Sequence, residues 1–115
     1  MGKHGITTHV LDTSSGRPAN GIPVALELAA TAGKWRALGR ATTDASGRVP
    51  DLLHGESLLL GTYRLCFETA AYFAARQLRG FYPEIHVIFE VRNADEHYHV
   101  PLLLSSYGYS TYRGS

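Results

Sequence analysis

One apolar stretch decides the fold, the sequence HYHVPLLLS at residues 97–105. Successive side chains of a β-strand point to opposite faces of the sheet, so alternate residues share a face. The even positions from Tyr98 to Leu104 are all apolar and predict a face against a hydrophobic core. The odd positions begin with His97 and His99 and are expected to point away from that core.

The beginning of the chain repeats this pattern. If Thr8 and Val10 face the core, then His9 and Leu11 share the outward face of a strand expected at 6–12. Outward faces that carry leucine beside histidine are apolar enough to favour burial against another subunit. We therefore expect the surface around His9 to lie in an interface between copies of the chain.

Strand-like runs make up most of the chain and are separated by turns rich in Gly, Asn, Asp and Pro. We expect one all-β domain over residues 1–115, an antiparallel β-sandwich of about eight strands with one short helix. The expected strands lie at 6–12, 23–29, 35–42, 62–68, 85–92, 97–105 and 107–112, with a further short strand near 48–53.

The helix is expected to follow Thr69, whose side chain is of the type that caps helices. Gly80 and Pro83 are expected to stop it. Four apolar residues recur between these limits at helical spacing: Ala71, Ala74, Ala75 and Leu78.

Two tight turns have a clear chemical basis. Asn20-Gly21 and Ser46-Gly47 each contain a glycine that accepts the positive φ angle of a sharp reversal. Asp44 can accept hydrogen bonds from the backbone that follows it.

Charge and composition exclude several kinds of partner. The 115 residues contain 11 Lys plus Arg and 10 Asp plus Glu, without a basic run that would attract nucleic acid. The first eight residues hold no long apolar stretch. We therefore expect neither a secretory signal nor a membrane span, and a cytoplasmic location. Cys66 is the only cysteine, which excludes an internal disulfide and a thiolate metal cluster, and it is expected to be a small buried hydrophobe.

The residues that could carry chemistry are His9, Arg48, His99 and the terminal segment 112–115. Each has an ordinary explanation when it is taken alone. Strand histidines are mostly surface residues, an arginine after a Ser-Gly turn is commonly solvated, and a chain end is commonly frayed. We interpret three other histidines as surface or internally satisfied residues: His4, His54 and His86.

The spacing of His97 and His99 also permits a zinc site, because residues two apart on a strand share a face. His9 could supply a third ligand. We favour a metal-free site, since no carboxylate lies at a characteristic spacing and two histidines on one strand are a weak signal. His97, next to Asp95 and Glu96, is then expected to be a supporting or exposed residue.

Five stretches of the chain together resemble one family. They are TTHVLDT at 7–13, TDASGR at 43–48, FYPE at 81–84, HYHVPLLLS at 97–105 and YSTYRGS at 109–115. Over almost its whole length the chain resembles the 5-hydroxyisourate hydrolases of the transthyretin-like protein family. One departure is Ser106, where the family usually has a proline that would stiffen the bend between the last two strands.

The resemblance implies a transthyretin-like (prealbumin-like) sandwich assembled as a homotetramer, a dimer of dimers whose channel holds the active sites. It implies ring opening of 5-hydroxyisourate to 2-oxo-4-hydroxy-4-carboxy-5-ureidoimidazoline in urate degradation, without a metal or other cofactor. The family's catalytic roles carry over to His9, Arg48 and His99. Its substrate-binding wall carries over to Tyr112, Arg113, Gly114 and Ser115.

The three catalytic side chains suit the addition of water to an acyl carbon. Histidine exchanges protons near neutral pH, so His9 and His99 are the expected base and acid, in an order left open. Arg48 offers fixed donors to the oxygens of a flat, partly anionic substrate and stabilises the developing negative charge. No serine or cysteine has the setting of a covalent nucleophile, which favours direct attack by water.

Two other functions compete with hydrolysis. A carrier like transthyretin shares the fold but holds thyroid hormone in its channel, where apolar contacts suit better than a cluster of proton carriers. A non-catalytic sandwich module would share the Thr-Asp-x-x-Gly turn, because a fold alone does not establish function. Such a module has no reason to end in the sequence at 112–115.

Overall fold

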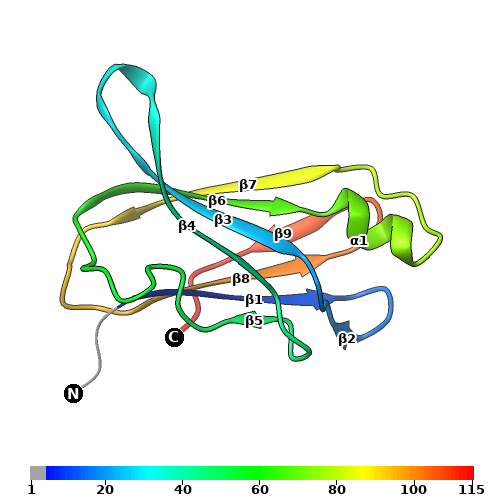
Figure 1. Cartoon of the computed structure of the whole chain (residues 1–115). Helices are drawn as coiled ribbons and strands as arrows, with labels where there is room; N and C mark the ends of the chain where they lie inside the picture. Colours follow the sequence, from blue (N-terminus) through cyan, green and yellow to red (C-terminus); the bar gives the residue numbers. More distant parts are fainter. Residues whose placement is uncertain (1–4) are drawn as a thin grey trace.

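We describe the protein from a computed structural model, in which the described residues are 5–115. His4, interpreted above as a surface or internally satisfied residue, lies outside them. Two β-sheets are layered against each other, with a short helix at one end (Figure 1). The elements are β1 (Ile6–Asp12), β2 (Arg17–Pro18), β3 (Pro23–Ala29), the 3-10 turn η1 (Thr31–Gly33), β4 (Trp35–Thr42), β5 (Arg48–Val49), β6 (Gly61–Glu68), the helix α1 (Ala70–Ala75), β7 (Glu84–Val91), β8 (Tyr98–Leu104) and β9 (Tyr109–Thr111).

The first sheet has the order β2-β1-β8-β9, with β5 also pairing with β1, and the second has the order β4-β3-β6-β7. Neighbouring strands are antiparallel with one exception in the described residues, since β1 and β8 run parallel. Their register begins with Ile6 opposite Tyr98 and ends with Asp12 opposite Leu104. The whole second sheet lies between these strands in the chain, so no short turn sets their relative direction.

The long strands lie close to their predicted positions. β1, β3 and β4 begin and end as predicted, while β6, β7 and β8 each differ by one residue at one or both ends. β2 and the turn η1 were not predicted. β9 is shorter than the predicted strand, because Gly108 accepts a hydrogen bond from the backbone N–H of Ser105 and closes a turn.

The fifth strand is also shorter than predicted, and covers only Arg48–Val49. Leu52 and Leu53 follow it outside any strand, yet they are 0% and 2% exposed. The predicted strand at 48–53 was therefore wrong beyond Val49, because these leucines enter the core from a turn rather than through sheet pairing.

The inward faces predicted from alternation form the hydrophobic core. Each fully buried Leu or Phe side chain contributes about 1.5–3 kcal/mol of hydrophobic stabilisation. Among the core residues are Val24, Leu26 and Leu28 of β3, Tyr63, Leu65 and Phe67 of β6, and Tyr98, Val100, Leu102 and Leu104 of β8.

The outward face of β1 and β8 is only partly exposed within a single chain. His9, Leu11 and Leu103 are half-buried there. Pro101, which we expected on this outward face, is already buried. The C-terminal segment covers it, since a Cβ placed on Gly114 would lie 3.4 Å from Cγ of Pro101.

The helix differs from the prediction at its start. Thr69 occupies the N-cap position, but its hydroxyl donates to the carbonyl oxygen of Tyr82 at 2.5 Å and makes no capping bond. The buried face of α1 carries Tyr72 and Phe73, whereas the predicted alanine positions are exposed. Bulky aromatic side chains reach the core from this end of the sandwich where alanine cannot.

The helix also ends earlier than predicted, at Ala75 rather than near Gly80. Gln77 adopts a positive φ of 59°, and the N–H of Leu78 donates to the carbonyl oxygen of Phe73 at 2.9 Å. This left-handed C-terminal cap stops the helix before Pro83 is reached. Among the residues that the structure describes, no helix is long and apolar enough to span a membrane.

Candidate active site

Three neighbouring strands place the predicted catalytic residues on one face of the first sheet. His9 of β1 lies opposite Arg48 of β5. Thr7, two residues before His9 on the same strand face, lies opposite His99 of β8. The fold therefore brings His9, Arg48 and His99 together although they lie far apart in the sequence.

A tight turn before β5 positions Arg48. The Oδ1 atom of Asp44 accepts hydrogen bonds from the backbone N–H groups of Ser46 at 2.8 Å and Arg48 at 3.0 Å. The bond from the Arg48 N–H holds the pKa of the Asp44 carboxyl below its usual value, against the opposing effect of desolvation. Gly47 has a φ of +74° and lies against the carbonyl oxygen of Val10, so a Cβ has no room there.

Thr7 joins the two histidines of β8. Its Oγ1 atom lies 3.0 Å from Nε2 of His97 and 2.8 Å from Nδ1 of His99. A hydroxyl carries one proton, so it donates to one ring nitrogen and accepts from the other. The prediction missed Thr7 as a site residue. Its position on the same strand face as His9 is the signal that could have revealed it.

The surroundings of His99 favour its neutral form. Burial lowers the pKa of His99 below the ordinary value of 6.5, and the positive charges of Arg48, His9 and His97 lower it further. The described residues form no hydrogen bond with Nε2 of His99, while Nδ1 is held by Thr7. A neutral imidazole oriented in this way can accept a proton at Nε2.

The end of the chain runs beside β8. The antiparallel register of β8 and β9 continues beyond the strand to a bridge between His99 and Gly114. The Gly114 N–H donates to the His99 carbonyl oxygen at 2.8 Å. A Cβ on Gly114 would lie only 2.6 Å from Cδ2 of His99, so glycine permits the close approach of the backbone to the ring.

Tyr112 and Ser115 lie in this same terminal segment. By register, Tyr112 is opposite Pro101 and therefore on the same face as His99. Its side chain is 56% exposed in the single chain. Ser115, the last residue, is also exposed. Tyr112 is thus placed to border the surface that holds His99.

Arg113 points to the other face of the sheet, as strand alternation requires for the residue between Tyr112 and Gly114. Its guanidinium lies 4.3 Å from the ring centre of Tyr98 and 3.0 Å from Oε1 of Glu96. It also donates to the carbonyl oxygen of His97 at 3.2 Å. In the single chain, Arg113 therefore holds the terminal segment in place and does not border His99.

One groove of the chain lies elsewhere. It has a volume of about 740 Å³ and is formed by the edge strand β7 and by the terminal segment, including Ile88 and Arg113. None of its lining residues is His9, Arg48 or His99. In the single chain, His9 and His99 are half-buried and Arg48 is exposed.

The spacing does not support the alternative zinc site. Within residues 5–115, three potential ligand atoms lie within 4.8 Å of one another at Cys66, Glu84 and His86, which belong to the second sheet. His97 and His99 are instead joined through Thr7. The remaining histidine, His54, has its Nε2 atom 3.2 Å from the carbonyl oxygen of Arg40, which agrees with its interpretation as a satisfied residue.

Comparisons with known proteins identify relatives of this chain in sequence and in fold. The 5-hydroxyisourate hydrolase of Salmonella dublin is 46% identical over 114 residues, covering 99% of this chain and 83% of that protein. The structure of Klebsiella pneumoniae 5-hydroxyisourate hydrolase has a TM-score of 0.84 and 34% identity, covering 96% of this chain and 98% of that chain. Sea bream transthyretin in complex with thyroxine has a TM-score of 0.89 and 27% identity, covering 95% and 93% of the two chains.

The match to the family is nearly complete. Residues 6–114, which include both predicted catalytic histidines, Arg48 and most of the terminal segment, match the model of one family. The chain therefore belongs to the HIUase/Transthyretin family.

Proposed function

We propose that this chain, as a single domain, hydrolyses 5-hydroxyisourate and yields 2-oxo-4-hydroxy-4-carboxy-5-ureidoimidazoline, a step of urate degradation. The observation that carries the proposal is the meeting of His9, Arg48 and His99 on one sheet face. The similarity to named hydrolases supports it, since identity is higher to the Salmonella hydrolase than to sea bream transthyretin.

His99 is the proposed base. Its lowered pKa keeps the ring neutral near pH 7, and Thr7 orients it through Nδ1. His99 removes a proton from water through Nε2 as the water oxygen attacks an acyl carbon of the substrate ring. The bond from that carbon to the ring nitrogen then breaks, and the nitrogen takes up a proton.

Arg48 and His9 are the proposed partners of this base. The Arg48 guanidinium can donate two parallel hydrogen bonds to substrate oxygens and stabilise the oxyanion that forms as water adds. His9, opposite Arg48 in the sheet, protonates the leaving nitrogen. A positioned acid or base of this kind contributes about 100- to 10,000-fold in rate.

The terminal segment forms the proposed wall of the site. Tyr112 and Gly114 border the substrate on the outward face, with Gly114 packed against the His99 ring. Ser115, which is exposed, forms the end of this wall. Arg113 supports this wall from behind through Glu96 and Tyr98. Its proposed contribution to substrate binding is therefore indirect.

The proposed active form is a homotetramer in the cytoplasm. β7 and β9 are edge strands of their sheets. Ile88 of β7 and Tyr112, which follows β9, are 59% and 56% exposed. Pairing of such edges between two copies would cover these residues. A second contact, through the face with Leu11 and Leu103, would then enclose His9 and His99 within a channel.

The absorbance decay of fresh 5-hydroxyisourate tests the activity, with a chelator present and with protein omitted as the control. We expect decay well above the spontaneous rate. Thyroxine binding without faster decay would establish a carrier instead, and loss of activity in chelator that zinc restores would establish a metal enzyme. Light scattering tests the assembly, and a fully active monomer would contradict the channel.

A further inference from the structure

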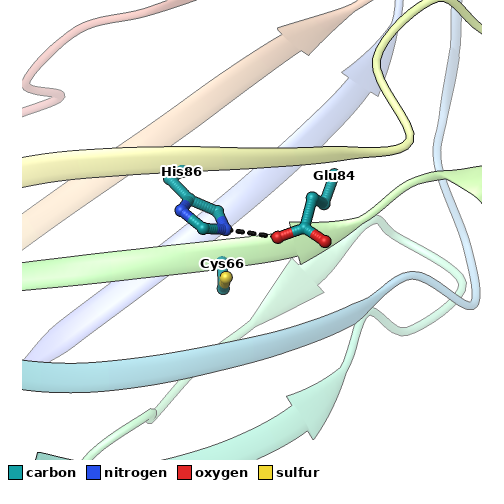
Figure 2. A group of neighbouring side chains, drawn as sticks. All are labelled: Cys66, Glu84 and His86. Atoms are coloured by element: carbon teal, nitrogen blue, oxygen red, sulfur yellow. Dashed lines mark hydrogen bonds and ion pairs between the residues drawn. The ribbon is translucent and has the colours of Figure 1, made fainter. Parts of the chain in front are cut away.

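The outward face of the second sheet carries a cluster that has no part in the proposed hydrolysis. Cys66 of β6 lies directly opposite His86 of β7, and Glu84 precedes His86 by two residues on the same strand face. Their side chains converge, as Figure 2 shows, and Nε2 of His86 lies 2.5 Å from Oε1 of Glu84. One potential ligand atom from each residue lies within 4.8 Å of the other two.

We propose that Cys66, Glu84 and His86 bind a divalent transition-metal ion of the zinc type. Thiolate, imidazole and carboxylate are the ligands that zinc takes in proteins, at bond lengths near 2.0–2.3 Å. In a tetrahedral site such bonds place neighbouring ligand atoms about 3.5 Å apart. Small side-chain rotations would therefore accommodate the ion, which would replace the proton shared by Glu84 and His86.

The ligand atoms are presented by a rigid scaffold. The antiparallel register of β6 and β7 holds from Gly61 opposite Val91 to Glu68 opposite Glu84. Cys66 and His86 are a cross-strand pair within this register, so their backbones are fixed before an ion arrives. Three protein ligands leave a fourth tetrahedral position for water.

Further carboxylates lie near the ligand atoms, and negative charge of this kind attracts a metal ion. A thiol gives up its proton when it binds such an ion. The cluster lies in a hollow of about 580 Å³ that also contains Glu27 and Glu68.

The arginines in this hollow are engaged with other partners. Arg64 pairs with Glu27 at 2.6 Å, and its guanidinium also lies 4.3 Å from the ring centre of Trp35. Arg40 pairs with Glu68 at 2.9 Å. Both guanidinium groups therefore bind carboxylates other than that of Glu84. Among the interactions described for the Glu84 side chain, its partner is His86.

Cobalt(II) is the probe for the test, because a thiolate bound to cobalt gives a charge-transfer band in the near ultraviolet. The full chain, stripped with chelator, is titrated with cobalt(II). We expect this band to saturate near one ion per chain and to disappear when zinc is added. Cys66→Ser should lose the band, and Glu84→Gln and His86→Asn should each weaken binding at least about tenfold.

His97→Asn is the matched control, since it alters a histidine on the opposite sheet without touching the cluster. It should leave the cobalt band and the affinity unchanged. Thermal unfolding without metal checks that every variant is folded. The proposal is overturned if the wild-type chain shows no thiolate band, if Cys66→Ser binds cobalt as tightly as the wild type, or if only His97→Asn loses binding. None of these readouts depends on hydrolase activity.

Discussion

The hydroxyl oxygen of Thr7 lies 2.8 Å from Nδ1 of His99, on a parallel strand pair that no hairpin connects. This contact fixes which ring nitrogen of His99 faces the protein. Because the same hydroxyl also contacts His97, Thr7 links the proposed base to a residue outside the catalytic group. The contact makes Thr7 a positioning residue for the reaction proposed above.

Thr7→Val should lower kcat about tenfold with little change in KM, because a misoriented base slows the chemical step more than it weakens binding. Thr7→Ser keeps the hydroxyl and should restore most of the rate. Steady-state kinetics measure both variants. Thr62→Val, on the second sheet, is the control and should behave as the wild type. Equal rates for Thr7→Val and the wild type would remove Thr7 from the site.

The pKa of His99 should lie below the ordinary value for histidine. Burial and the charge of Arg48 lower its pKa below 6.5, so the ring is neutral at pH 7 and becomes protonated only as the pH falls through the lowered value. We therefore expect kcat/KM to fall on the acid side, where His99 can no longer accept a proton.

Arg48→Gln removes one of the charges that lower the pKa of His99, so that pKa should rise. Titration of the histidine ring protons by NMR measures the shift directly, without relying on activity. Arg40→Gln, whose partner Glu68 lies on the second sheet, is the control and should leave His99 unchanged. A pKa of His99 at or above 6.5 in the wild type would contradict the assignment.

His99→Asn and Arg48→Ala should each lower turnover at least about a hundredfold while the protein stays folded, as expected for loss of a base or an oxyanion donor. His86→Asn should leave turnover nearly unchanged, because His86 lies on the opposite sheet. The hydroxyisourate absorbance assay and thermal unfolding measure the two properties. Similar losses at His86 and His99 would show that the effect is not specific to the site.

Gly114→Ala should lower turnover about a hundredfold, because its Cβ would lie 2.6 Å from Cδ2 of His99 and displace the ring. Gly108→Ala provides a matched control in the same region. A Cβ there would lie 3.7 Å from Oγ of Ser105, which is an ordinary contact. If both variants retained the wild-type rate, the close approach of Gly114 to His99 would be irrelevant to catalysis.

Deleting 112–115 should remove most activity and little thermal stability. The deletion loses the bond from Gly114 to His99 and the exposed ion pair of Arg113 with Glu96, and exposed pairs contribute only about 0–1 kcal/mol. The assay and a thermal melt measure the two effects. A tag after Ser115 should also be harmful, whereas a tag before Met1 should be tolerated. A truncated chain with full turnover would exclude the terminal segment from the site.

Local alternation determined much of the fold from the sequence by itself. β1, β3 and β4 begin and end as predicted, and burial alternates along β1 and β3 as their sequence patterns indicate. The course of the helix could not be read in this way. Its end depends on the left-handed conformation of Gln77, and the burial of Tyr72 and Phe73 depends on their packing in the core.

The candidate site could likewise be predicted only in part from the sequence. His9, Arg48 and His99 could be named from local motifs, and the outward direction of the two histidines followed from strand parity. Only the tertiary structure decided that Thr7 touches His99 and that Cys66 meets His86, since both contacts depend on the register between strands that are distant in the chain. Register is set by the packing of whole sheet faces, and no short stretch of sequence contains that information.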